Sequence, residues 1–217
     1  MNQGDFLIPA YLWDAGAGLF FDSYLKWGQF YPALMGALTT IPMYFFGKEL
    51  FSKETGLSAA FFIAVISGAL RRTSAGFFEK EPIGTFLMML SLAFFARAWK
   101  RTSWREGILS GISLGLFTIS WGGVDIMYYV YPMIITPVLF LNEDIRSMIA
   151  AYTPTILLGT FIGAIINPSR FWFTENLFLI NISILGLLWF RHLVEEFQIT
   201  NEKYLPYLIP STGVLGG

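Results

Sequence analysis

Residues 55–70 of this sequence read TGLSAAFFIAVISGAL and residues 83–96 read IGTFLMMLSLAFFA, two runs without a charged side chain. Between them, residues 71–82 read RRTSAGFFEKEP and carry five charged side chains. A membrane-spanning helix needs about 20 mostly apolar residues, and basic residues gather where a chain leaves the bilayer. The pattern therefore predicts two membrane helices that are joined by a charged loop at a membrane surface.

The composition of the whole chain agrees with a membrane location. The 217 residues are 55% hydrophobic and 13% charged, whereas soluble domains carry about 25% charged residues. The formal net charge of −1 gives no basic field, so no nucleic-acid partner is expected. Cysteine is absent and His192 is the only histidine, which excludes disulfides, thiolate metal sites and multi-histidine clusters. We therefore expect a polytopic membrane protein whose surroundings are membrane lipid.

Further uncharged runs continue this pattern along the chain. They are Trp27–Gly47, Gly107–Val124, Ile126–Asn142, Ser147–Ser169, Asn176–Phe190 and residues 204–217. The period-2 alternation of membrane β-barrel strands is missing. The sequence predicts an all-α bundle of about seven to eight membrane helices, in which residues 1–217 form a partial transmembrane domain, incomplete at both ends. The segment Phe6–Trp13 is expected to be a helix end or a piece that lies at the membrane interface.

The distribution of lysine and arginine between alternate loops predicts the orientation. When the predicted helices are followed along the chain, nine basic residues fall on one side and five on the other. The five are Lys26, Arg71, Arg72, Lys80 and Arg170. Because basic residues favour the cytoplasmic side, the loop of residues 71–82 is expected on the external face of the cell membrane.

Glu79 and Glu81 are two carboxylates separated by one residue in this loop. Pro82 disfavours the α conformation at Glu81, and in an extended segment the side chains of residues i and i+2 point the same way. We therefore expect converging carboxylates, which suit a hard divalent cation such as Mg²⁺ or Mn²⁺. The spacing alone is equally compatible with a solvated loop whose charges are incidental.

Arg71 and Arg72 precede this carboxylate pair. A guanidinium group suits bidentate contacts with phosphate oxygens, and Gly76 allows the backbone between them and the pair to turn tightly. Arginine beside a metal site at a membrane surface indicates a phosphorylated lipid head group as a ligand.

Three elements in a fixed order carry a resemblance to a known family. Residues 72–81, RTSAGFFEKE, resemble the second short acidic motif of the oligosaccharyltransferase catalytic subunit in its archaeal form. Residues 31–42, YPALMGALTTIP, which lead into GKELF at 47–51, resemble the Pro-x-x-x-Gly-Ala-Leu helix of that family. Residues 120–123, SWGG, resemble its Ser/Ala-Trp-Gly-Gly element. The resemblance covers most of residues 25–150.

The resemblance implies a membrane helix bundle of the GT-C type and a metal-dependent glycosyltransferase. Such an enzyme transfers a glycan from a dolichol phosphate or pyrophosphate carrier to Asn in Asn-x-Ser/Thr sequons of an acceptor protein. By motif position, Glu79 and Glu81 would be the catalytic residues and would bind Mn²⁺ or Mg²⁺. Arg72, with Arg71 beside it, would bind the donor phosphate. The implied substrate cavity is lined by Trp121, Gly122 and Gly123.

The sequence also departs from the family pattern. Glu79 stands where the family usually has Asp, so its carboxylate reaches about one methylene further. No Asp-x-Asp motif precedes Trp27. The family's sequon-holding loop has no counterpart at the expected position, and the soluble C-terminal domain with Trp-Trp-Asp-Tyr-Gly is absent from the 217 residues. We therefore expect a fragment of the enzyme that is inactive alone.

Two other functions fit the same residues. A different GT-C enzyme, which moves a single sugar from a lipid phosphate to a hydroxyl group, would share the external acidic loop but not the Trp-Gly-Gly element. A transporter or channel subunit would use Glu79 and Glu81 as an ion site, although transporters tend to place such charges near the bilayer midplane on broken helices.

Overall fold

The computed structural model describes residues 4–76, 79–140, 144–166 and 175–208, and within these residues every regular element is a helix. The predicted all-α class is therefore confirmed. In chain order the elements are α1 (Gly4–Asp14), η1 (Ala17–Leu19), α2 (Tyr24–Leu50), α3 (Lys53–Val65), α4 (Ser67–Arg72), α5 (Glu81–Arg101), α6 (Trp104–Ser120), η2 (Gly122–Val124), α7 (Asp125–Phe140), α8 (Ile145–Ile166) and α10 (Glu175–Leu208), where η marks a 3₁₀ helix.

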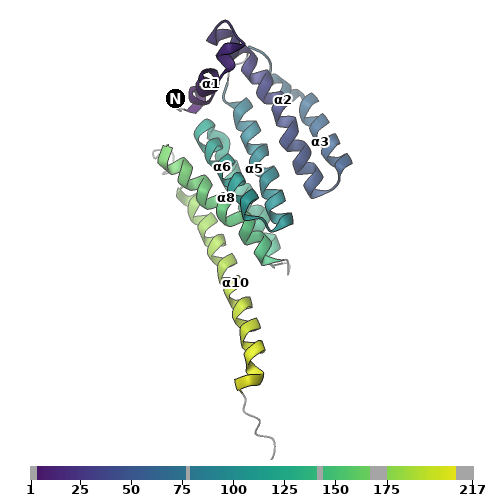
Figure 1. The fold of residues 1–217 in the computed structure, drawn as a ribbon, viewed down its shortest axis with the longest axis vertical. Helices are drawn as coiled ribbons and strands as arrows, with labels where there is room; N and C mark the ends of the chain where they lie inside the picture. The colour runs from purple at the N-terminus through teal and green to yellow at the C-terminus, as the bar shows by residue number, and fades with distance from the viewer. Residues whose placement is uncertain (1–3, 77–78, 141–143, 167–174, 209–217) are drawn as a thin grey trace, which may run out of the picture.

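The helices pack both with chain neighbours and with helices further along the sequence. Figure 1 shows α2 and α3 as a hairpin at one side, α5, α6 and α8 in the middle, and α10 running away from the bundle. α2 packs against both α3 and α5, α5 packs against α6, and α10 packs against α7 and α8. The contact between α6 and α8 is the most extensive in the described bundle, although α7 separates them in the chain.

Glycine allows α6 and α8 to approach closely. A Cβ atom on Gly107 would lie 2.3 Å from the carbonyl oxygen of Ala150, and one on Gly111 would lie 2.4 Å from that of Pro154. Gly115 continues the same face of α6 at a spacing of four residues, against Ile162. Small residues spaced in this way let membrane helices pack backbone to backbone. The α6–α8 contact therefore depends on the missing side chains.

Buried polar side chains are paired with each other across the helices. In the first group, the Ser91 hydroxyl on α5 lies 2.6 Å from the Tyr131 hydroxyl on α7 and 3.2 Å from the Ser110 hydroxyl on α6. In the second, the Tyr152 hydroxyl donates to Asn181 Oδ1 at 2.8 Å, joining α8 to α10. Polar groups in a lipid-embedded bundle need partners inside the protein. These two groups satisfy that requirement and fix how the helices face each other.

A cluster of charges joins α2, α5 and α6 at one end of the bundle. Glu49, whose side chain is largely buried, accepts from Arg101 Nη2 at 2.9 Å and lies 3.8 Å from Arg97 Nε. Arg97 also lies 3.3 Å from Glu106 Oε1 on α6, and Lys100 donates to the Glu49 carbonyl oxygen. These basic residues belong to the set of nine predicted on one side of the membrane, and the structure places this part of the set together.

The structure confirms that the chain contains helices able to span a membrane and corrects the bounds of two of the predicted runs. Four stretches of the described helices are long and apolar enough to cross a membrane: Glu81–Arg101, Gly122–Leu139, Ile145–Ile166 and Asn176–Phe197. The predicted run from Thr55 to Leu70 is broken, because Ile66 is extended with φ −65° and ψ 127° and separates α3 from α4. The expected separate run after residue 204 begins within α10, which continues without a break to Leu208.

The glycine stripe gives a direct test of the packing. Gly111→Ala introduces a methyl group against the α8 backbone and is expected to lower the free energy of unfolding by about 1–3 kcal/mol, as overpacking does. Gly186→Ala on α10 is the control, because a Cβ there meets nothing within 4 Å. Denaturant unfolding in detergent micelles measures both variants. Equal stability of the two variants would contradict the close α6–α8 contact.

Candidate functional site

The break at Ile66 directs α4 to the end of the bundle opposite the Glu49 cluster. α4 is a single short helix, Ser67–Arg72, which carries Arg71 and Arg72 in its last turn. Its end is stabilised by hydroxyl groups, since the Thr73 Oγ1 atom donates to the Ala69 carbonyl at 2.9 Å and Ser74 Oγ donates to that of Leu70 at 2.6 Å. The two arginines are therefore carried on a helical turn.

Two contacts fasten the turn after α4 to α2. A Cβ atom on Gly36 of α2 would lie 2.5 Å from the Thr73 Cβ atom, so Thr73 occupies space that only glycine leaves free. Gly76 donates its backbone N–H to the Gln29 carbonyl at 2.8 Å and has φ 90°, a conformation that favours glycine. The predicted tight turn at Gly76 is confirmed. The backbone around Arg72 is thus held by α2.

Arg72 brings the two predicted carboxylates together. Its Nη1 atom lies 2.8 Å from Glu79 Oε2 and 3.6 Å from Glu81 Oε1. Glu81 is the first residue of α5, where the partial positive charge of a helix N-terminus favours an anion. The carboxyl groups of Glu79 and Glu81 also lie close enough to interact with each other. The expected convergence of the pair is therefore confirmed.

The expected reason for this convergence is wrong. The sequence favours an extended Glu79-Lys80-Glu81, but Lys80 has φ −80° and ψ −21° and caps a helix that already includes Glu81. Proline is tolerated in the first helical turn, because the N–H group that it lacks has no partner within the helix there. The carboxylates meet because the chain turns into α5 and because Arg72 contacts both of them.

The pair has the chemistry of a partial site for a divalent cation. Glu81 Oε2 is buried and has no hydrogen-bond partner among the described residues, so one carboxylate oxygen is available as a ligand. In the described part of the chain no group of three or more acidic, histidine or cysteine residues is gathered in a way that could hold a metal. Mg²⁺ is commonly held by one or two carboxylates and keeps several waters. Two carboxylates fit that need.

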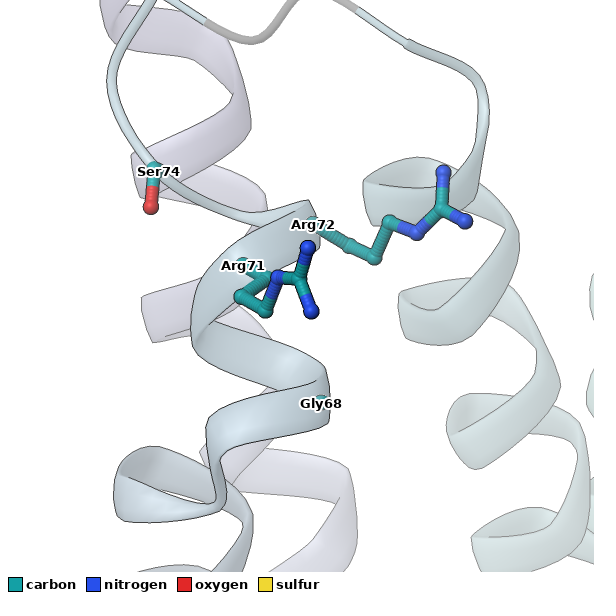
Figure 2. Close-up of a pocket in the computed structure, with 4 residues that line it drawn as sticks. All are labelled: Gly68, Arg71, Arg72 and Ser74. Carbon is teal, nitrogen blue, oxygen red and sulfur yellow. The ribbon is translucent and has the colours of Figure 1, made fainter.

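Arg71 and Arg72 line a hollow at the end of α4. Gly68, Arg71, Arg72 and Ser74 surround a volume of about 470 Å³, which we name the arginine hollow. Figure 2 shows Arg72 extending away from α4 towards the neighbouring helix, whereas Arg71 stays close to α4. Both guanidinium groups are exposed, and a phosphate group is the anion that such a pair suits best.

Trp121 lies at the same end of the bundle as Glu81. A Cβ atom on Gly84, three residues after Glu81 in α5, would lie 2.8 Å from Trp121 Cε3, and one on Gly123 would lie 2.9 Å from the far edge of the indole. Phe117 lies beside the indole, with ring centroids 5.8 Å apart. Trp121 is therefore wedged between Gly84, in the first turns of α5, and Gly123 of η2.

Sequence reasoning missed Gly84, and it did not predict that Gly36 and Thr73, which stand in two of the quoted motifs, contact each other. Gly36 and Gly84 matter through the side chains that occupy the space they leave free. A weak signal exists for Gly84, since a glycine in the first turn of a helix leaves room for a large partner. The aromatic pair Phe77 and Phe78 of the acidic motif lies outside the described residues.

Comparison with protein families decides what this arrangement belongs to. Residues 28–207 match the family model described as "Oligosaccharyl transferase STT3, N-terminal". The chain belongs to the STT3 family. The match continues well beyond residue 150, where the sequence offered only its hydropathy. The family named from the three motifs is therefore confirmed.

Relatives in plants, yeast and archaea are similar to this STT3 chain. It is 24% identical over 187 residues to an Arabidopsis thaliana glycosyltransferase subunit, STT3B, covering 82% of this chain and 25% of the relative. It is 30% identical over 129 residues to stt3 of Schizosaccharomyces pombe, covering 59% and 17%. An Archaeoglobus fulgidus glycotransferase is 30% identical over 106 residues, covering 43% and 12%. The chain thus spans a quarter or less of these relatives.

Solved structures show the same fold. The archaeal oligosaccharyltransferase AglB from Archaeoglobus fulgidus, in complex with an inhibitory peptide and a dolichol-phosphate, superposes with a TM-score of 0.71 at 16% identity, covering 97% of this chain and 27% of that one. An apo crystal structure of an oligosaccharyltransferase from the same organism gives 0.69 at 21% identity, covering 96% and 26%. The STT3 chain therefore has the GT-C type membrane fold that the resemblance implies.

The wedge of Trp121 against Gly84 is testable by a double-mutant cycle. Gly84→Ala is expected to lower the free energy of unfolding by about 1–3 kcal/mol, because the added methyl group meets the indole. In a Trp121→Ala background the same substitution has room and costs less, so the two changes are coupled. Gly68→Ala is the control, since nothing lies within 4 Å of that position. An equal cost of Gly84→Ala in both backgrounds would show that the indole is not the obstacle.

Proposed function

We propose that this chain forms the donor side of an oligosaccharyltransferase active site, which transfers a glycan en bloc from a dolichol phosphate or pyrophosphate to Asn in Asn-x-Ser/Thr sequons. The observation that carries the proposal is the meeting of Arg72 with both Glu79 and Glu81 at the start of α5, in a chain of the STT3 family. The names of the relatives describe glycosyl transfer from a dolichyl-linked oligosaccharide to protein, which supports the proposal. The chain would supply part of a larger enzyme.

Glu79 and Glu81 are the metal ligands in this proposal. They would hold Mn²⁺ or Mg²⁺ through carboxylate oxygens, of which Glu81 Oε2 is buried and has no hydrogen-bond partner among the described residues. When bound, the cation supplies positive charge that stabilises the leaving phosphate. The N-terminal end of α5 is a poor place for a bare cation, so the negative charge of both carboxylates is needed to hold it there.

The same carboxylates also bear on the acceptor. An amide nitrogen is a poor nucleophile, because its lone pair is conjugated with the carbonyl group. A carboxylate that accepts a hydrogen bond from the Asn side-chain amide holds that group in place and favours loss of the conjugation. One of the two glutamates would make this contact.

Arg71 and Arg72 would bind the donor phosphate in the arginine hollow. Guanidinium groups match phosphate oxygens in geometry and charge, and Arg72 both lines the hollow and contacts the carboxylate pair. Trp121, Gly122 and Gly123 would border the same substrate cavity, since Trp121 packs against the first turn of α5. Donor and metal would thus meet at one end of the bundle.

The proposal also places residues 71–82 on the external face of the membrane and takes the remaining parts of the enzyme from outside this sequence. The excess of basic residues on the opposite side, nine against five, supports an external location for residues 71–82. The acceptor-binding loop, the other acidic motif and the soluble domain would come from residues outside this sequence. Residues 1–217 alone are therefore expected to transfer no glycan.

Substitution of both carboxylates tests the function. Glu79→Gln combined with Glu81→Gln, in the full-length protein that contains this chain, is expected to lower transfer by at least about 100-fold, because charge stabilisation at the reacting phosphate is lost. The measurement is glycosylation of a sequon peptide in membranes supplied with lipid-linked oligosaccharide and Mn²⁺. Glu54→Gln, which removes an exposed carboxylate on α3, is the control. Transfer within about twofold of the parent enzyme would show that the two glutamates are not the catalytic pair.

A further inference from the structure

Arg72 lies at the position that a cation would take between the two carboxylates. A single nitrogen atom, Nη1, contacts Glu79 Oε2 at 2.8 Å and approaches Glu81 Oε1 at 3.6 Å. Two carboxylates that converge repel each other unless positive charge lies between them. The guanidinium group supplies that charge. A divalent cation held by the same two carboxylates, whether through these oxygens or through Glu81 Oε2, would meet this guanidinium charge at short range and repel it.

We propose that Arg72 is a displaceable cation, which holds Glu79 and Glu81 together until a divalent metal replaces it and which then binds phosphate in the arginine hollow. This inference rests on the proposed function, because it takes the two glutamates as metal ligands and the hollow as the phosphate site. It adds a coupling between the two ligands. Metal binding creates part of the phosphate site, and phosphate binding favours the state that admits the metal.

The structure favours movement of the side chain over movement of the backbone. Thr73 is fitted against Gly36 and Gly76 is hydrogen-bonded to Gln29, so the turn after Arg72 is held by α2. The Arg72 side chain itself is 54% exposed. Long exposed side chains change rotamer rapidly. The displaced guanidinium group therefore needs only rotation about its own bonds to leave the carboxylates.

The arginine hollow is the place where the released guanidinium group would be used. Arg72 already forms one wall of it, together with Arg71 and Ser74 (Figure 2). Arg71 makes no ion pair with any of the described residues, so its charge is not neutralised by a protein carboxylate there. A divalent cation at Glu79 and Glu81 would repel Arg72. A phosphate in the hollow would attract it, and the two forces act in the same direction.

Metal affinity gives the first test. Mn²⁺ binding to the full-length protein that contains this chain, in detergent and followed by electron paramagnetic resonance, is compared for the parent protein and Arg72→Gln. Removal of the competing guanidinium group is expected to tighten Mn²⁺ binding about threefold to tenfold, the scale on which partly exposed ion pairs contribute. Lys80→Gln is the matched control. Lys80 stands between the two glutamates in the sequence and carries the same charge as Arg72, but it makes no ion pair with a described residue. This substitution is expected to change the affinity less than about twofold.

Phosphate affinity gives the second test and separates the outcomes. Binding of farnesyl phosphate, and of inorganic phosphate in parallel, is measured with and without Mn²⁺. In the parent protein Mn²⁺ is expected to tighten binding, and Arg72→Gln is expected to remove most of this coupling, which is reciprocal by thermodynamic necessity. Coupling with both ligands assigns the effect to the phosphate group, and coupling with farnesyl phosphate alone assigns it to the lipid carrier.

Three results would overturn the inference. Equal tightening of Mn²⁺ binding by Arg72→Gln and Lys80→Gln would show that the loss of any nearby positive charge has this effect, and not the loss of the Arg72 contact. If the coupling between Mn²⁺ and phosphate binding survives Arg72→Gln, it comes from direct contact between the metal and the phosphate group. Both results leave the proposed function intact. The absence of Mn²⁺ binding in every variant at millimolar concentrations would reject the two glutamates as metal ligands, and with them the proposed function.

Discussion

The close approach of α6 to α8 is the contact on which the site depends. Gly107, Gly111 and Gly115 let the two backbones meet, and α5 packs against both α6 and α8. The end of α6 carries Trp121, which presses on Gly84 in the first turn of α5. The position of Glu81 is therefore fixed through three helices. In lipid, where apolar surface gains little by leaving its surroundings, such close packing is the main source of cohesion.

The site itself is an arrangement of charges on short and constrained pieces of chain. Arg72 is presented by one helical turn that two contacts fasten to α2, and Glu81 by the first residue of α5. Neither group needs a deep cavity, because their shared ion pairs define the geometry. Such pairs contribute little to stability, at most about 1 kcal/mol each when exposed. Their role in this account is functional, since a weakly held guanidinium group is readily exchanged for another cation.

Much of this was predictable from the sequence, because the informative signals are local. Uncharged runs predict the membrane helices, and three motifs in order predict the family. The break at Ile66 was not predictable, because Ile66 is an ordinary apolar residue and the nearby Gly68 lies inside α4. The extended conformation expected for Lys80 and Glu81 was wrong, because Glu81 is helical although proline follows it, and Pro82 stands in the first turn of α5, where proline is tolerated. The contacts of Thr73 with Gly36 and of Trp121 with Gly84 join residues more than 30 positions apart, and no local pattern encodes them.

The central claim is that a divalent cation binds between Glu79 and Glu81, and its most direct test is magnetic. The sequence has no cysteine, so a single spin label can be attached at Ala75→Cys, beside the pair, or at Lys53→Cys, at the other end of the bundle. Mn²⁺ is predicted to broaden the spectrum of the label at position 75 and not of that at position 53, and Glu79→Gln with Glu81→Gln is predicted to abolish the effect. Equal broadening at both positions, or broadening that survives the double substitution, would contradict the account.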